Sequence, residues 1–255
     1  CAEQMLYAAC FRAMAEISEQ IGKDGSVYRA EYEKLTAVIE KFFWDEEKGA
    51  YIDSFTSGRR NVTRHANIFA ILFSIADEKQ QEKILKNVLE NDEIPAITTP
   101  YFNFFELDVL CRMGKLTEVL DKIRSYWGGM LDLGAVTFWE EYDPSVPKEE
   151  QYDMYGDHFG KSLCHAWAAS PIYFLAKYFA GLDLVNKDGV TYILKPQMQY
   201  FTELDCTLPV GSNGVVRLVW DGEILEITPN ADGGILELGE QKLSLVRGET
   251  RRVKI

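Results

Sequence analysis

A change in hydrophobic period near residue 182 constrains the fold of this chain more than any other feature. Before it, apolar residues recur at spacings of three and four, as on one face of an α-helix. The first such stripe contains Met5, Leu6, Ala9, Cys10, Met14 and Ile17. After it, apolar and polar residues alternate in short runs between turn residues, which is the period of half-buried strands. The chain is therefore predicted to be mainly α with a smaller all-β domain.

Turn residues divide the first part into seven predicted helices, joined as antiparallel pairs. We expect them near residues 2–21, 26–42, 65–74, 77–89, 100–112, 116–126 and 161–179. The last should kink or restart at Pro171, since proline cannot donate a backbone hydrogen bond. Residues 128–160 form a loop longer than an ordinary helix–helix turn, and such loops are often functional. Helix pairs with long loops suggest an α/α toroid whose active site lies at the loop end.

The second part is predicted to be an antiparallel β-sandwich or half of a jelly roll. Its strands are expected near residues 191–194, 200–208, 215–220, 224–227, 235–238 and 243–246. We place the boundary so that residues 1–182 form the helical domain and residues 183–255 the C-terminal β-domain.

Charge and motifs exclude several classes of function. The net charge of −13 argues against nucleic acid, an anionic membrane surface or a highly acidic polymer as partner. A neutral substrate fits best, although the acidity could simply aid solubility. No apolar run approaches the roughly 20 residues of a membrane-spanning helix. The five cysteines lack zinc or redox spacing, and the motifs of phosphate, zinc-protease and serine-hydrolase sites are missing. We expect no cofactor and no metal.

Carboxylates and aromatic rings gather in the long loop, at Trp139-Glu140-Glu141-Tyr142-Asp143. Hydrolysis of a glycoside with inversion needs one carboxylic acid to protonate the leaving oxygen and one carboxylate to activate water. A carboxylate held beside aromatic walls and hydrogen-bond donors suits the second role. The spacing alone is equally compatible with a solvated acidic loop.

Five further residues could bind a sugar. His165 and Trp167 begin the predicted seventh helix, where positions i and i+2 diverge by about 200°. His65 and the Tyr101-Phe102 pair follow loops at the starts of earlier helices. Free N–H groups at helix starts and aromatic faces near loops are natural sugar platforms. The alternative is that these side chains cap and pack their helices, and that His165 is structural.

Two motifs resemble those of bacterial α-L-rhamnosidases of glycoside hydrolase family 78. They are Gly134-Ala-Val-Thr-Phe-Trp-Glu140 and Ser162-Leu-Cys-His-Ala-Trp-Ala-Ala-Ser-Pro171, and the family patterns are close to GATTxWExWD and SLCHGWSAGP. The segments 43–49, 65–67 and 99–102 and the tail from Lys195 are also similar to the family. The resemblance implies the second half of an (α/α)6 barrel over residues 1–182, then a β-sandwich, and inverting cleavage of terminal α-L-rhamnose.

The resemblance also implies roles for individual residues. Glu140 would be the general base. The rhamnose would be bound by His165, Trp139, Trp167, Tyr101, Phe102 and His65. Ala166 and Ser170 replace the family's glycines and Tyr142 replaces its second tryptophan, which leaves the base in place but puts the sugar specificity in doubt.

The family's general acid lies in an acidic segment upstream, and no match to it occurs here. We therefore expect the acid outside this chain, and the chain alone to be inactive. The resemblance suggests a rhamnose-containing oligosaccharide, polysaccharide or glycoside as partner, and a periplasmic or secreted bacterial protein.

Other classes of function fit some of the same residues. One is a different exo-glycosidase or a polysaccharide lyase on an α/α toroid, although a lyase acts on uronates, which the negative charge disfavours. Another is a non-catalytic carbohydrate-binding module whose aromatic residues hold a sugar without cleaving it.

Overall fold

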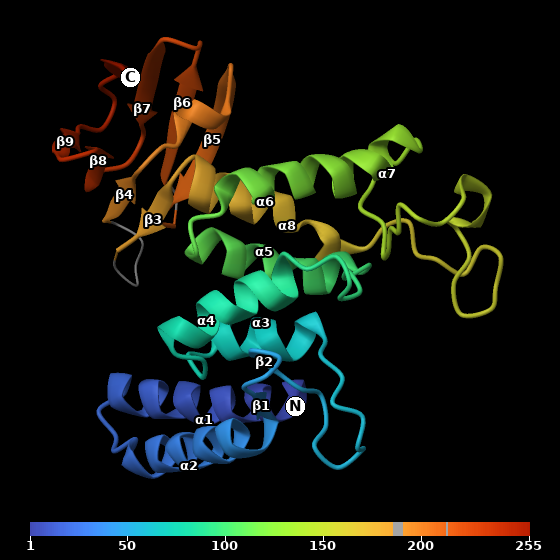
Figure 1. The fold of residues 1–255 in the computed structure, drawn as a ribbon. Helices are drawn as coiled ribbons and strands as arrows, with labels where there is room; N and C mark the ends of the chain where they lie inside the picture. The colour runs from blue at the N-terminus through green and yellow to red at the C-terminus, as the bar shows by residue number, and fades with distance from the viewer. Residues whose placement is uncertain (186–190, 213) are drawn as a thin grey trace. The chain divides into compact units, whose positions relative to one another are not determined.

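The computed structural model describes residues 1–185, 191–212 and 214–255. It divides into two compact units (Figure 1). One contains residues 1–113 and 139–163, and the other contains residues 114–138 and 164–255. Compact units defined by packing need not coincide with domains, so the boundary expected at residue 182 stays a prediction.

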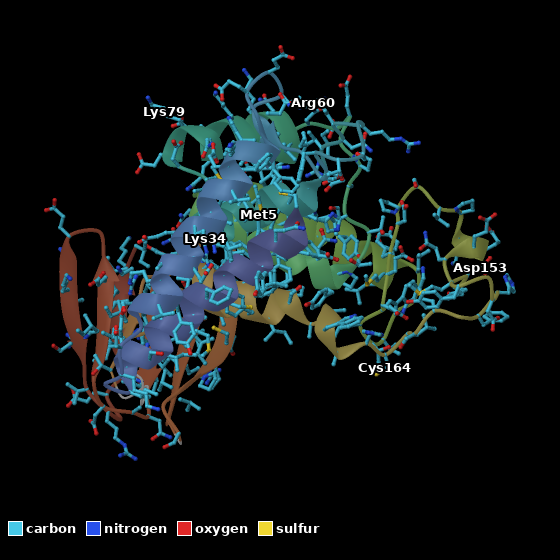
Figure 2. The ribbon with its side chains drawn as sticks, turned by 90° about the horizontal axis from the view of Figure 1, so that it is seen from below. Met5, Lys34, Arg60, Lys79, Asp153 and Cys164 are labelled. Carbon is cyan, nitrogen blue, oxygen red and sulfur yellow. The ribbon has the colours of Figure 1, made fainter. Side chains whose placement is uncertain are left out.

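The first unit is built from helical hairpins. Its helices are α1 (Ala2–Gln20), α2 (Ser26–Phe43), α3 (Arg64–Leu72), α4 (Glu78–Ile84), the π-helical turn η1 (Leu85–Leu89) and α5 (Pro100–Arg112). Helix α1 packs against α2 and α3, and α3 packs against α5. The side chain of Met5 on α1, labelled in Figure 2, is fully buried, whereas Lys34 on α2 is exposed. Because η1 continues α4 directly, these elements form five helical segments, which confirm the first five predicted.

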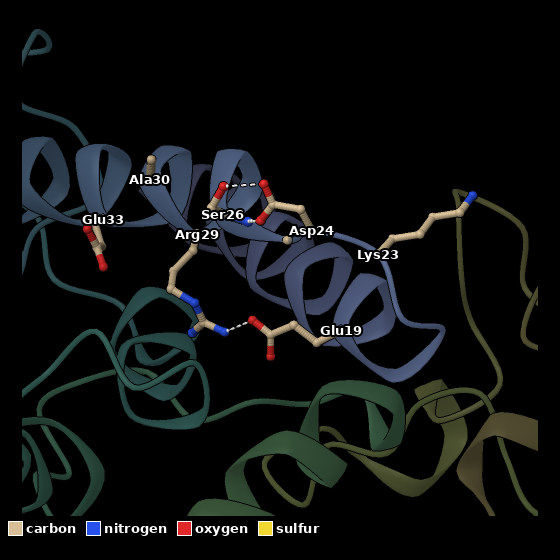
Figure 3. Close-up of a pocket in the computed structure, with 8 residues that line it drawn as sticks. Glu19, Lys23, Asp24, Ser26, Arg29, Ala30 and Glu33 are labelled. Atoms are coloured by element: carbon tan, nitrogen blue, oxygen red, sulfur yellow. Dashed lines mark hydrogen bonds and ion pairs between the residues drawn. The ribbon is translucent and has the colours of Figure 1, made fainter.

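The turn between α1 and α2 is closed by local polar contacts. The Asp24 carboxylate accepts hydrogen bonds from the Ser26 N–H at 2.8 Å and the Ser26 hydroxyl at 2.9 Å. Arg29 forms an ion pair with Glu19 below them (Figure 3). The hollow of about 350 Å³ beside these residues belongs to this turn and contains no predicted site residue.

A short hairpin precedes α3 and fixes its position. Strands β1 (Trp44–Asp45) and β2 (Ala50–Tyr51) pair antiparallel. The fully buried Asn67 side chain accepts a hydrogen bond from the Tyr51 N–H at 2.8 Å and donates to the Tyr51 carbonyl at 3.0 Å. This amide therefore joins β2 to the first turn of α3, where His65 lies.

The second unit begins with one continuous helical segment. It consists of α6 (Leu116–Lys122), the π-helical turn η2 (Ile123–Trp127) and α7 (Gly128–Asp132). The sequence prediction ended this helix at residue 126, which was wrong. The glycines at its end do not stop the helix, because Trp127 and Met130 are buried on one side of it.

The last helical segment begins later than predicted. The residues before it are not helical, and His165 has extended backbone angles, φ −122° and ψ 104°. The helical segments here are η4 (Ala166–Ala168), α8 (Ser170–Phe174) and η5 (Leu175–Phe179). A helix starting at residue 161 was therefore wrong, because the backbone N–H of His165 is bonded to the Phe138 carbonyl instead. The restart at Pro171 is confirmed, since this residue lies in the first turn of α8.

The rest of the second unit is a sandwich of two four-stranded sheets. Its strands are β3 (Leu182–Leu184), β4 (Tyr192–Leu194), β5 (Leu204–Val210), β6 (Gly214–Trp220), β7 (Ile224–Pro229), β8 (Gly234–Leu238), β9 (Gln241–Leu245) and β10 (Arg251–Lys254). The strand orders are β10-β7-β6-β5 and β3-β4-β8-β9. All neighbours pair antiparallel except β4 and β8, which are parallel.

Both sheets contribute to one apolar core. Tyr192 and Leu236 from one sheet and Leu218 and Ile227 from the other are fully buried in it. The fully buried Phe179, at the end of η5, packs its ring 5.8 Å from that of Phe201. The predicted fold class, mainly α with a smaller β-sandwich, is confirmed.

Candidate active site

The loop that contains Glu140 is folded on itself. The Trp139 side chain is only 3% exposed and packs 5.6 Å from the ring of Tyr152. The buried Gln151 amide donates to the carbonyls of Asp143 at 2.6 Å and Val146 at 2.8 Å. Because the loop has its own buried aromatic residue and its own hydrogen bonds, it can hold a side chain in a defined position.

Glu140 lies half-buried between hydrogen-bond donors. Its backbone N–H donates to the Ser162 carbonyl at 2.9 Å, and the Ser162 N–H donates to Glu140 Oε2 at 3.1 Å. The Tyr155 hydroxyl donates to Oε1 at 3.1 Å. This hydrogen bond and the nearby negative charge raise the pKa of Tyr155, which therefore keeps its proton. Donors to both oxygens stabilise the negative charge that a base requires.

The neighbouring Glu141 has different contacts. Its Oε1 accepts a hydrogen bond from the Thr98 hydroxyl at 2.9 Å. The next backbone N–H, that of Tyr142, donates to the Thr98 carbonyl at 3.3 Å. Glu141 therefore ties the loop to the segment that precedes α5.

A buried lysine lies within the same acidic loop. Lys161 is 9% exposed, and burial lowers its pKa, while the nearby charges of Glu141, Asp143, Asp153 and Glu140 oppose that shift. Its cationic form offsets the negative charge that these carboxylates concentrate. The sequence analysis did not single it out, although a lysine directly before Ser162, at the end of an acidic loop, was a usable signal.

His65 and the start of α5 form an aromatic group in the first unit. The His65 ring lies 4.2 Å from that of Phe102. Phe102 and Tyr101 both contact Phe105, at 5.3 and 5.6 Å, and Tyr101 is 46% exposed. Burial lowers the pKa of His65 against the opposing charges of Asp53 and Glu106. The ring is therefore neutral at pH 7 and can both donate and accept hydrogen bonds.

His165 and Trp167 lie together in the second unit. Their ring centroids are 4.2 Å apart, and Trp167 is 52% exposed. The prediction that they diverge was wrong, because His165 is extended and only residues 166–168 form a helical turn. The Trp127 indole N–H donates to the Ala168 carbonyl at 2.8 Å, which holds that turn in place.

The predicted site residues thus divide between the two units. Trp139, Glu140, His65, Tyr101 and Phe102 belong to the first unit. The remaining two, His165 and Trp167, belong to the second.

The predicted site residues also differ in how far their side chains are exposed to solvent. The nearly buried Trp139 anchors the loop, whereas the exposed faces of Tyr101 and Trp167 are open to a ligand. The sequence analysis missed Tyr155, because tyrosine is not among the residues that signal a tight turn.

Two absences concern only the part of the chain that the structure describes. No group of three or more His, Cys, Asp and Glu side chains there is arranged to hold a metal ion. No helix there is both long and apolar enough to cross a membrane.

A hollow of about 780 Å³ between the β1–β2 hairpin and residues 86–95 includes none of the predicted site residues.

The chain thus combines helical hairpins with a long loop that holds a carboxylate between hydrogen-bond donors. The family model described as bacterial alpha-L-rhamnosidase 6 hairpin glycosidase domain matches residues 1–179. This chain belongs to that family, as its motifs predicted.

Solved structures of rhamnosidases are similar to this chain. A rhamnosidase from Klebsiella oxytoca with rhamnose bound is 28% identical, with a TM-score of 0.60 over 69% of this chain and 34% of that chain. A rhamnosidase of family GH78 from Bacillus sp. GL1 is 22% identical, with a TM-score of 0.76 over 92% of this chain and 26% of that one. An alpha-L-rhamnosidase from Streptomyces avermitilis complexed with L-rhamnose is 16% identical, with a TM-score of 0.66 over 91% of this chain and 22% of that chain.

The chain spans between 22% and 34% of the length of these three rhamnosidases. A comparison with curated proteins finds no match.

Proposed function

We propose that this chain is part of an α-L-rhamnosidase that cleaves terminal α-L-rhamnosyl residues with inversion, and that Glu140 is its general base. The observation that supports this most is the position of the Glu140 carboxylate. It lies in the family motif and accepts hydrogen bonds from the Ser162 N–H and the Tyr155 hydroxyl. The similar Klebsiella protein, with rhamnose bound, supports the substrate class.

In the proposed reaction Glu140 takes a proton from a water molecule, and the water oxygen attacks the anomeric carbon. The bond from that carbon to the leaving oxygen breaks, and a general acid protonates this oxygen. Attack from the opposite face gives a β-configured product from an α-linked substrate. The acid is proposed to lie upstream, outside this chain.

The substrate is proposed to be a rhamnose-containing oligosaccharide, polysaccharide or glycoside. Rhamnose is a neutral deoxy sugar, so the negative charge of the chain does not oppose its binding. In the first unit the exposed ring of Tyr101 can pack on its C–H face, and neutral His65 can bond its hydroxyls. Phe102, His165 and Trp167 are the other proposed sugar-binding residues, and Trp139 holds the loop of the base.

Replacing Glu140 with glutamine in the intact protein tests this proposal. Glutamine keeps the shape but cannot accept the proton, so kcat on an aryl α-L-rhamnoside should fall by about 10³-fold or more. Binding of rhamnose, measured by calorimetry, should persist.

Glu141→Gln is the matched control, because it changes the next carboxylate, which is bonded to Thr98. Its kcat should stay within about tenfold of wild type. If Glu140→Gln also retains activity within that margin, Glu140 is not the base.

A further inference from the structure

A tight hairpin turn lies in the long loop at residues 154–157. The Met154 N–H donates to the Asp157 carbonyl at 3.0 Å, and the Asp157 N–H donates back at 2.9 Å. Tyr155 has φ +55° and Gly156 has φ +81°. Positive φ at both central residues is the geometry of a type I′ turn.

Tyrosine is an unfavourable residue for the first central position of such a turn. Glycine, asparagine and aspartate are preferred there, because a bulky side chain crowds the backbone at positive φ. Within the described residues, Tyr155 and Ser74 are the non-glycine residues with positive φ. The Tyr155 side chain is 83% exposed, so burial does not offset the strain. Strain that packing does not compensate is found most often at functional sites.

The strained turn places the phenol of Tyr155 beside the carboxylate of Glu140. Its hydroxyl reaches Oε1 of Glu140 at 3.1 Å, while the Ser162 N–H binds Oε2 of the same carboxylate. The phenol oxygen therefore lies beside the carboxylate that the proposed reaction uses to activate water. It can itself accept a hydrogen bond from that water.

We propose that Tyr155 is a positioning residue for the water that Glu140 activates, an inference that rests on the proposed function. The tyrosine hydroxyl donates to Oε1 and fixes the rotation of the carboxylate. The water gives one proton to Glu140 and directs its second O–H to the phenol oxygen. These two contacts orient the water so that a lone pair on its oxygen faces the anomeric carbon. The turn holds the phenol beside the carboxylate at the expense of backbone strain.

The test is Tyr155→Phe in the intact protein, assayed by steady-state kinetics with an aryl α-L-rhamnoside. We expect kcat to fall about tenfold with little change in KM, because the variant loses orientation and not sugar contacts.

Tyr155→Gly separates a role in catalysis from a role in folding. Glycine adopts positive φ freely, so the thermal midpoint should stay equal or rise while kcat falls as in Tyr155→Phe. Tyr7→Phe is the control, since it removes another exposed hydroxyl, on α1. It should leave kcat and KM unchanged.

Three outcomes would count against specific claims. If Tyr155→Phe keeps the wild-type kcat, the positioning role is wrong. If Tyr155→Gly loses stability, or if its KM rises as much as its kcat falls, the residue serves only the structure of the loop and the inference again fails. If the wild-type protein does not cleave the rhamnoside, the proposed function fails, and that result is seen before any variant is compared.

Discussion

At the scale of single residues, Asn67 shows how a side chain without a chemical role can position a site. Its amide is fully buried and makes three hydrogen bonds to backbone groups, two with Tyr51 and one to the Thr63 carbonyl at 2.8 Å. These bonds hold the start of α3 against β2, and His65 lies in that turn of α3. The sequence motif His65-Ala-Asn67 therefore combines a proposed ligand-binding residue with the residue that supports it.

Asn67→Ala should destabilise the protein strongly. The change leaves the buried N–H and C=O of Tyr51 without partners, and each such group costs about 1–3 kcal/mol. We expect a loss of about 2–4 kcal/mol in the free energy of unfolding, measured by urea denaturation. Asn61→Ala, at an exposed position before α3, is the matched control and should change stability by less than about 0.5 kcal/mol. Equal effects of the two changes would contradict this account.

The residues of the site differ in how far the sequence could predict them. Glu140 and His165 belong to motifs that resemble those of a known family, and this resemblance selected them where spacing alone left alternatives open. Tyr155 could not be selected in this way, because its contact with Glu140 crosses fifteen positions of loop. That contact depends on a turn geometry that tyrosine disfavours. Residues held against their local preference are the ones that local rules miss.

At the scale of elements, the helices were predicted best where an apolar stripe continues for several turns. Helices α1, α2 and α5 have such stripes and agree with their predicted ranges within about two residues. The errors lie at ends where tertiary contacts decide the structure. Residues 161–165 have a helical composition, but the backbone of His165 bonds to Phe138 instead.

The strands show the same division. The alternating runs that became β6 and β7 were predicted almost completely. Strand β3 is too short to show a period, and β10, with the sequence Arg-Arg-Val-Lys, lies at the edge of its sheet. Charged residues are common on edge strands, because they discourage pairing with other chains. Composition therefore hid β10, and only the pairing with β7 reveals it.

The α1–α2 hairpin depends on a close approach at one glycine. A Cβ added at Gly25 would lie 2.6 Å from the Ala15 carbonyl oxygen, which belongs to the backbone and cannot move aside easily. We expect Gly25→Ala to separate the helices and to destabilise the protein by about 1–3 kcal/mol.

Gly128→Ala is the matched control for this prediction. Gly128 lies in a helix with nothing within 4 Å of an added Cβ. Alanine there should stabilise the protein by about 0.5–1 kcal/mol, since glycine weakens a helix. Thermal denaturation should show a lower midpoint for Gly25→Ala and a higher midpoint for Gly128→Ala. Stabilisation by Gly25→Ala would contradict the close packing.

At the scale of the whole molecule, the proposed reaction needs a second carboxyl group, which we propose to lie outside this chain. Inverting hydrolysis requires two carboxyl groups with different roles, one ionised and one protonated. The loop contains several carboxylates besides Glu140, but those with described partners are engaged in local bonds. Glu141 binds Thr98, and Asp143 binds the Ser145 backbone at 2.9 Å. The chain spans at most about a third of the rhamnosidases it was compared with.

The chain of 255 residues, expressed alone, should therefore not hydrolyse an aryl α-L-rhamnoside, whereas the intact protein should. Without an acid the leaving oxygen departs unprotonated, which removes about 10²–10⁴-fold of the rate. The hydrolysis rate of both proteins is measured by release of the aryl alcohol. A cooperative thermal transition confirms that the isolated chain is folded. The intact Glu140→Gln variant sets the background rate. Turnover by the folded chain well above that background would show that its own residues supply the acid.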